Sequence, residues 1–178
     1  MEIRNATASD VSAIVAVDHV AADDIHRRQN IHDWVTASHA IIATTENVVV
    51  GYSVLEYNFF GCGFVPMLLV TKEYRRKGVA TALLTHLEER CRTEKLFTST
   101  NQSNKPMQAL MKRLCYERSG TIYNLDDGDP ELFYIKRFQR TQKEKKFPCT
   151  MNGLKELNPN GKRSTDSMNA LHEDRGAW

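Results

Sequence analysis

The sequence predicts a mixed α/β domain of the α+β type, in which a mostly antiparallel central sheet is flanked by helices. Three observations lead to this fold class. Strand-like segments alternate with segments whose apolar residues recur at the helical period. Three strand-like segments follow one another within 39–70 with only short turns between them, which favours antiparallel pairing. A helix and a further strand come next, so the second half contains a βα crossover.

The N-terminal part is predicted to hold one short strand and two helices. Residues 2–5 form the strand, and Thr7 or Ser9 can cap a helix over 11–20. A second helix is expected over 24–37. The three consecutive strands are then predicted over 39–45, 48–60 and 64–70.

The middle of the chain predicts an amphipathic helix that begins at Val79. Its apolar positions fall on one stripe, while the charged residues 88–90 and 92 fall on the other side. The stripe consists of Val79, Ala80, Leu83, Leu84, Leu87 and Cys91. A strand over 95–100 follows this helix.

The end of the domain predicts one more helix and a hairpin. Ser103 or Asn104 can cap the helix, and Pro106 suits its first turn. The helix has one apolar face, made of Met107, Leu110, Met111 and Leu114. Strands over 120–125 and 132–138 then close around the turn sequence DDGDP.

From Gln139 onward the composition changes. Residues 139–178 are polar, with scattered Asn, Gly, Pro and Ser, and eight Lys/Arg against five Asp/Glu give them a net charge of +3. Such a segment buries too little apolar surface to offset the entropy of ordering it. We therefore expect a folded domain over 1–138 and a disordered, basic tail over 139–178. The alternative is a short amphipathic helix near 167–171 that docks on the domain.

The bulk properties exclude several classes of protein. A net charge of +2 on 178 residues gives no strong field for nucleic acid or an anionic membrane. The apolar stretches are shorter than a membrane span, and the N-terminus lacks the apolar region of a secretory signal. The four cysteines show no metal-binding spacing. We expect a cytoplasmic protein with reduced thiols and no metal.

The segment 70–81, VTKEYRRKGVAT, carries the clearest chemical signal. It joins an apolar strand to an amphipathic helix, and Gly78 stands immediately before that helix. The first N–H groups of a helix lack internal partners and attract anions, so this junction is suited to phosphate. Neither a P-loop nor a dinucleotide-binding glycine pattern is present. A basic surface turn is the alternative interpretation.

The six residues from Arg75 to Ala80 fit the pattern Q/R-x-x-G-x-G/A, and on them the chain resembles the GCN5-related N-acetyltransferase (GNAT) superfamily. The resemblance covers roughly 1–138 and is tightest over 63–136, where it looks like a bacterial branch of small acetyltransferases. It implies a bulged fourth strand splayed from the fifth and an acyltransferase domain that binds acetyl-CoA. In this family the backbone amides of the loop hold the pyrophosphate.

The resemblance also implies further contacts with acetyl-CoA. Asn104 corresponds to the family's pantetheine contact, although it can equally be a plain helix cap. Pro66 cannot donate a ladder hydrogen bond, so it marks either the family's bulge or an edge strand. The implied cofactor-binding residues are Leu69, Val70, Arg75, Arg76, Lys77, Gly78, Val79, Ala80, Thr81 and Asn104.

The sequence departs from the family in two places. The tyrosine that protonates the leaving thiolate in many members corresponds to Met111, so Tyr116, Tyr123 or solvent would have to serve. The glycine that commonly ends this helix is replaced by Cys115, which predicts a small loss of stability or a shifted helix end. For the general base, Glu56 is the nearest candidate, against the alternative of an ordinary exposed strand residue.

We therefore expect an N-acetyltransferase that moves an acetyl group from acetyl-CoA to a primary amine by direct attack in a ternary complex. The acceptor is a small-molecule or peptide amine, with no nucleic-acid or membrane partner, and the protein is a monomer or homodimer. A regulatory module that binds acyl-CoA without turnover is the alternative. Acceptor-side candidates, each with a plain structural alternative, are His26, His32, Trp34, Tyr57, Phe59, Phe60, Asp126, Asp127, Asp129 and Glu131.

Overall fold

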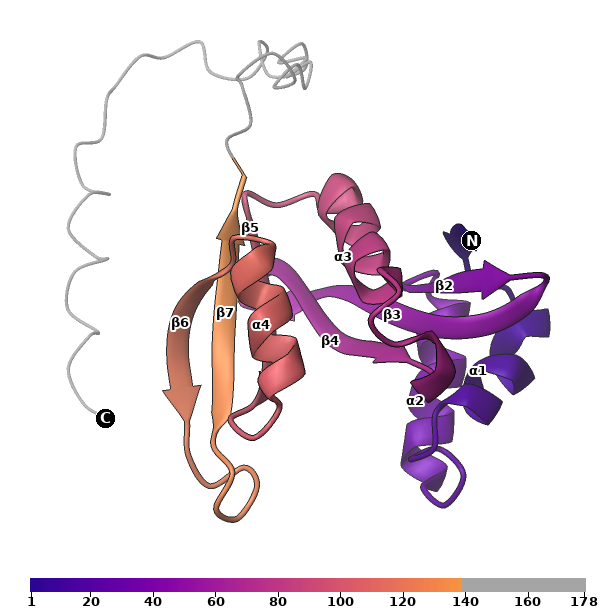
Figure 1. Ribbon diagram of the computed structural model, residues 1–178, viewed down its shortest axis with the longest axis horizontal. Helices are drawn as coiled ribbons and strands as arrows, with labels where there is room; N and C mark the ends of the chain where they lie inside the picture. The colour runs from indigo at the N-terminus through magenta and orange to yellow at the C-terminus, as the bar shows by residue number, and fades with distance from the viewer. Residues whose placement is uncertain (139–178) are drawn as a thin grey trace, which may run out of the picture. The chain divides into compact units, whose positions relative to one another are not determined.

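The computed structural model describes residues 1–138, which form one sheet with helices on both faces (Figure 1). The predicted tail over 139–178 lies outside the described residues. The helices are α1 (Val11–Val17), α2 (Ile25–Thr36), α3 (Val79–Arg90) and α4 (Lys105–Arg113), with 3-10 turns η1 (Ala8–Asp10) and η2 (Lys72–Tyr74). The strands are β1 (Glu2–Asn5), β2 (Ala40–Thr45), β3 (Val48–Phe59), β4 (Cys62–Val70), β5 (Lys95–Asn101), β6 (Glu117–Ile122) and β7 (Glu131–Arg137).

The sheet confirms the predicted fold class. Its strand order is β1-β2-β3-β4-β5-β7-β6, and every neighbouring pair is antiparallel except β4 with β5. The parallel pairing runs only from Gly63 opposite Leu96 to Val65 opposite Thr98. Beyond this point β4 runs away from β5, as Figure 1 shows.

Pro66 lies at a bulge in the central strand β4, as expected from the first of its two interpretations. Val54 pairs with Met67 and Glu56 pairs with Phe64, so β4 carries one residue more than β3 between these pairs. The extra residue bends the strand and increases its twist. Because proline has no N–H to donate, the parallel ladder to β5 ends immediately before it.

Two hydrophobic cores hold the helices to opposite faces of the sheet. Leu83, Leu84 and Leu87 of α3 pack with Leu110 and Met111 of α4 in one core. The other core joins α1 and α2 to β2 and β3, and its largest members include Ile14, Ile31, Ile42 and Tyr52. The predicted apolar stripes therefore face the sheet, and Met111 is fully buried as the sequence indicates.

Helix α1 ends earlier than predicted because Asp18 leaves the helical conformation. This residue has φ −92° and ψ 95°, and its side chain is buried. The carboxylate accepts hydrogen bonds from the Tyr52 hydroxyl at 2.5 Å and the Val20 backbone N–H at 3.1 Å, with Arg27 Nε at 3.6 Å. These partners satisfy a buried charge that would otherwise be costly.

Strand β6 begins and ends three residues before its predicted range. Residues 123–130 form a long connection instead, with Asn124 and Gly128 at φ 65° and 76°. Asp126 accepts a hydrogen bond from the Asn101 amide, and Asp129 accepts two from Ser103. The acidic residues thus fasten this connection to the end of β5 and to the β5–α4 loop.

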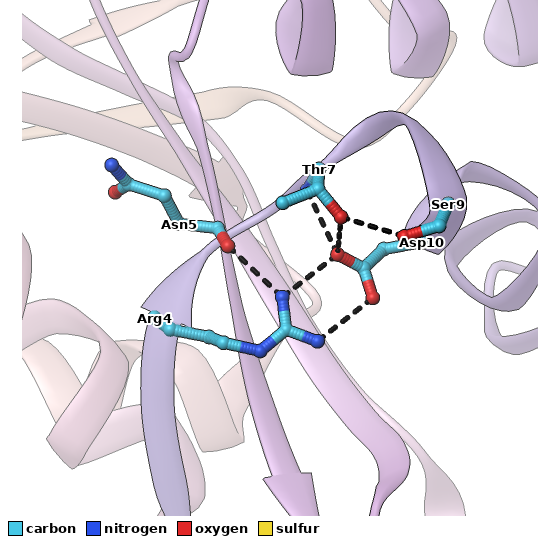
Figure 2. A network of polar contacts seen from close by, with 5 residues as sticks. All are labelled: Arg4, Asn5, Thr7, Ser9 and Asp10. Carbon is cyan, nitrogen blue, oxygen red and sulfur yellow. Dashed lines mark hydrogen bonds and ion pairs between the residues drawn. The ribbon is translucent and has the colours of Figure 1, made fainter.

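A polar network joins β1 to the first turn of the chain (Figure 2). Arg4 donates to both carboxylate oxygens of Asp10, at 2.8 and 2.9 Å, and Thr7 donates its N–H and hydroxyl to the same carboxylate. The hydrogen bonds from Arg4, and then those from Thr7, hold the pKa of Asp10 well below its usual range against the opposing effect of burial. The network fixes the entry of the chain into α1.

Helix α4 ends at Arg113, and Cys115 takes the position just beyond the helix where the family commonly has glycine. The N–H of Tyr116 donates to Met111 O at 2.9 Å, and that of Cys115 donates to Lys112 O at 3.2 Å. These two bonds form a Schellman motif, which places Cys115 at φ 60°. A residue with a Cβ atom is strained in that region, so the helix end is maintained at a cost.

None of the helices within residues 1–138 is both long and apolar enough to span a membrane.

We predict that Asp10→Asn lowers the free energy of unfolding by about 1–2 kcal/mol at pH 7, because it removes a charge-assisted pair whose Arg4 side is partly exposed. The pKa of Asp10 is lowered in the folded state, so its stabilisation is present above the unfolded pKa of about 3.9 and is lost as the pH falls through the folded pKa. Urea unfolding should show the difference from wild type shrinking below that pH. The control is Asp23→Asn on the exposed α1–α2 loop, and a difference independent of pH would contradict this account.

We predict that Cys115→Gly raises the free energy of unfolding by about 1 kcal/mol, because glycine adopts positive φ without a Cβ clash. Thermal or urea unfolding would measure the gain. Cys115→Ala keeps the Cβ atom and should give no such gain, so equal stabilisation by both variants would show that the thiol, not the backbone, is responsible.

Candidate active site

A cavity of 1460 Å³ extends along α3 and α4 and past the end of β4. Nine of the ten predicted cofactor-binding residues line it, and Lys77 is the exception. The nine are Leu69, Val70, Arg75, Arg76, Gly78, Val79, Ala80, Thr81 and Asn104. The cavity thus brings together the basic loop, the end of the bulged strand and the start of the last helix.

The turn before α3 presents backbone N–H groups to this cavity. Arg76 and Gly78 have φ of 61° and 86°, which reverses the chain in front of the helix. Ala82 makes the first helical bond, from its N–H to Gly78 O at 3.0 Å, so the N–H groups of residues 79–81 precede any acceptor within the helix. A Cβ atom on Gly78 would meet nothing within 4 Å, which leaves the approach open. This geometry suits a phosphate or pyrophosphate group.

The exposed edge of β4 forms the second part of the cavity wall. The N–H of Thr71 donates to Val50 O at 3.0 Å, which shows that odd-numbered residues here bond to β3. Because N–H groups alternate along a strand, those of Leu68 and Val70 point toward the side from which β5 has diverged. The end of β4 can therefore form a ladder with an amide-containing ligand.

Two of the three basic side chains of the loop have contacts of their own. Arg75 Nε donates to Val70 O at 3.2 Å, which ties the loop to the end of β4. Lys77 Nζ lies 4.9 Å from the centroid of the Tyr74 ring and is absent from the cavity wall. Arg75 and Arg76 therefore supply the positive charge at the mouth of the cavity.

Helix α4 closes the other side of the cavity. The Asn104 side chain accepts the Met107 N–H at 3.2 Å, so this residue caps the helix and also lines the cavity. At the other end, Arg113 Nη2 donates to the Thr81 hydroxyl at 2.7 Å and so links α4 to the first turn of α3. Asn104, Met107, Leu110 and Arg113 recur at helical spacing, which was the signal that could have identified Arg113.

Glu56 lies outside the wall of this cavity, on β3 beside the bulge. Its side chain is 19% exposed, and both carboxylate oxygens accept hydrogen bonds, from Trp34 Nε1 at 3.0 Å and from Asn58 Nδ2 at 3.2 Å. His39 Nδ1 is 4.0 Å from Oε1. These contacts hold the carboxylate in place, so it is more ordered than an ordinary exposed strand residue.

Tyr116 does not line the cavity, which argues against its predicted role as general acid. The side chain is buried, with Lys136 Nζ 5.4 Å from its ring centroid. Lys136 in turn pairs with Glu88 at 2.6 Å. Burial, and next the Glu88 carboxylate, raise the pKa of Tyr116 far above its usual value. Tyr123 is exposed on the β6–β7 connection and also lies outside the cavity wall.

The other acceptor-side candidates separate into different places. Tyr57 packs with the α3 core, where its ring lies 4.6 Å from Arg92 Cζ, so it faces away from Trp34 and Glu56. Asp126 is bonded to Asn101 at the end of β5, and Asp129 is bonded to Ser103 in the β5–α4 loop. His26 and His32 lie on exposed parts of α2. Sequence reasoning missed two other cavity-lining histidines, His19 and His86, which carry no recognisable spacing.

Within residues 1–138, no group of three His, Cys, Asp or Glu side chains is arranged to hold a metal ion.

A bulged β4 that separates from β5, with a glycine turn before α3, is the fold of acetyltransferases that use acetyl-CoA. The model of the acetyltransferase (GNAT) family matches residues 9–115, more than half of the chain, and the protein belongs to this family. It is an acetyl-CoA-dependent acyltransferase. This confirms the family and the class of enzyme that the resemblance implied.

Solved structures agree with this assignment. A GNAT-family acetyltransferase from Bacillus cereus is 32% identical, covers 78% of this chain and 98% of its own, and has a TM-score of 0.73. The protein yncA from Salmonella typhimurium, solved with its cofactor acetyl-CoA, shares the fold at 19% identity and a TM-score of 0.68, over 79% of this chain and 95% of its own. A ribosomal-protein-alanine N-acetyltransferase from Brucella melitensis also shares the fold, at 23% identity and a TM-score of 0.66. The match covers 78% of this chain and 100% of that protein. Curated proteins gave no match to the chain.

We predict that Gly78→Glu weakens CoA binding by about tenfold or more, because it places a carboxylate beside the amides that face the phosphates. The matched control is Gly128→Glu, since Gly128 also has positive φ, at 76°, and open space around its Cβ position. Both substitutions place a side chain at positive φ, so only the first should lose affinity in calorimetric titration with CoA. Unchanged affinity in Gly78→Glu would show that the pyrophosphate lies elsewhere.

Proposed function

We propose that the protein is an N-acetyltransferase that moves the acetyl group of acetyl-CoA to a primary amine by direct attack in a ternary complex. One observation supports this proposal above the others. A single cavity connects the amides before α3 to the edge of β4 that faces the gap left by β5. A ligand with a pyrophosphate at one end and amides along its arm fits both features at once.

In the proposed complex the pyrophosphate accepts from the N–H groups at the start of α3, and Arg75 and Arg76 add positive charge. The pantetheine amides pair with the free edge of β4 near Leu68 and Val70, and Asn104 contacts the arm from α4. All of these residues lie within 1–138, so we assign the acyltransferase domain to that segment.

The reaction requires a neutral amine, because an ammonium has no lone pair for attack on the thioester carbon. We assign Glu56 as the base that takes the ammonium proton, directly or through a water molecule. The nitrogen then forms its bond to the carbonyl carbon, and a backbone N–H of Leu68 or Val70 stabilises the oxyanion. The nitrogen, which becomes positively charged on attack, loses its second proton to solvent as the C–S bond breaks and the amide forms. The CoA thiolate takes a proton from solvent, since Met111 has none to donate.

The acceptor is a small-molecule or peptide amine. The Brucella melitensis protein is named for acetylating an alanine of a ribosomal protein, and its fold is shared at an identity too low to transfer that substrate. The acceptor must therefore be argued from this chain's own residues.

We predict that thiol release from acetyl-CoA depends on an added primary amine and that Glu56→Gln lowers kcat by about 100-fold, with the Kd for CoA unchanged. A thiol assay over a panel of amines would measure this. The control is Glu46→Gln on the exposed β2–β3 turn, which should retain wild-type kcat. Binding of CoA without amine-dependent thiol release would contradict the proposed function. Full activity in Glu56→Gln would contradict only the assignment of Glu56 as the general base.

Tyr116→Phe tests the general acid separately. We expect kcat to stay within about twofold of wild type, because the hydroxyl is buried away from the cavity. A large loss of kcat at unchanged stability would restore Tyr116 as the acid.

A further inference from the structure

Four phenylalanine rings, one each from β3, β4, β5 and β7, form one cluster on the sheet. Phe59 is at its centre, with ring centroids 4.9 Å from Phe64, 5.2 Å from Phe97 and 5.7 Å from Phe133. Each of the four is only half-buried, and Phe60 beside them is 92% exposed. We call Phe59, Phe64, Phe97 and Phe133 the aromatic surface.

The aromatic surface lies on the face of the sheet opposite α3 and α4. Leu96 on β5 and Leu132 on β7 belong to the core beneath these two helices. Because successive side chains of a strand point to opposite faces, Phe97 and Phe133 point away from that core. The aromatic surface therefore lies on the face of β5 and β7 opposite α3 and α4, the helices that line the cofactor cavity.

Register places the aromatic surface next to Glu56, at the point where β4 and β5 separate. Glu56 is paired with Phe64, and Phe64 is paired with Phe97. The following pair, Val65 with Thr98, is the last one between β4 and β5. The Glu56 carboxylate and the rings of Phe64 and Phe97 thus form one row across the sheet. This row is one residue pair away from the point where β4 and β5 separate and the edge of β4 becomes accessible.

Glu56 is held in this row by two neutral hydrogen-bond donors. Trp34 Nε1 and Asn58 Nδ2 orient the carboxylate, and His39 Nδ1 lies 4.0 Å from Oε1. A carboxylate can accept about four hydrogen bonds, so room remains for an ammonium donor. A negative group bordered by ring faces is complementary to a cation with an apolar body.

We propose that the amine acceptor is a small primary amine with an apolar, preferably aromatic, body, and that it binds on the aromatic surface with its ammonium at Glu56. This inference rests on the proposed N-acetyltransferase function and names its substrate class. A polyamine or aminoglycoside would place several charged or hydroxyl groups against phenyl rings that offer them no hydrogen bonds, which is costly. An arylalkyl body buries apolar area there instead.

The test compares 2-phenylethylamine with spermidine in the thiol-release assay. We expect kcat/KM for 2-phenylethylamine to exceed that for spermidine by at least about tenfold. Phe64→Thr and Phe133→Thr should each raise KM for 2-phenylethylamine by about tenfold while the Kd for CoA stays unchanged, which also shows that the variants fold. The control is Tyr123→Thr, an exposed aromatic residue outside the cluster, with unchanged KM.

Three results would overturn the inference. A preference for spermidine, or Phe64→Thr and Phe133→Thr variants with unchanged KM, would show that the acceptor binds elsewhere while the proposed function stands. A dimer in light scattering that Phe60→Ser or Phe64→Thr dissociates would show that a second copy of the chain covers the surface. Absence of release with every amine, despite CoA binding, would instead refute the proposed function itself.

Discussion

The divergence of β4 from β5 is the constraint on which the site depends. An interior strand of a sheet normally forms hydrogen bonds along both of its edges. Here one edge of β4 pairs with β5 through only three residues, and the rest of that edge is unpaired with β5. The bulge at Pro66 makes this possible, since β3 still holds the strand while the register to the other neighbour is lost. Backbone groups that would be costly if buried without partners are left for a ligand to satisfy.

Charge is secondary to backbone geometry at the end of the cavity that is formed by the turn before α3. The cluster of four basic residues before Gly78 is the most conspicuous feature of the sequence, yet Lys77 lies against Tyr74 and Arg75 holds the end of β4. The positive φ of Arg76 and Gly78 is what turns the helical N–H groups toward the cavity. The basic side chains add positive electrostatic potential to a site that is formed by backbone N–H groups.

Features set by local chemistry could be predicted from the sequence, and those set by packing between distant segments could not. Gly78, Pro66 and Asn104 each act through their own backbone or cap, so the pattern around them was sufficient. The directions of Tyr57 and Tyr116 depend on which face of the sheet each reaches and on partners far along the chain, Arg92 for Tyr57 and Lys136 for Tyr116. The aromatic surface is of the same kind, because its four rings come from four strands and meet only through register.

The short parallel ladder has a mechanical consequence. Backbone pairing between the β1–β4 half and the β5–β7 half of the sheet amounts to three residue pairs, reinforced by the contacts Arg113–Thr81 and Lys136–Glu88. This seam is the part of the ladder that resists shear least, and opening it would leave each half with its own antiparallel pairing intact. A ligand that contacts both halves bridges the seam, and its binding energy is added to the work of separating them. With the ligand bound, the domain should therefore unfold as one unit, whereas without the ligand the two halves of the sheet can separate first at the β4–β5 pairing.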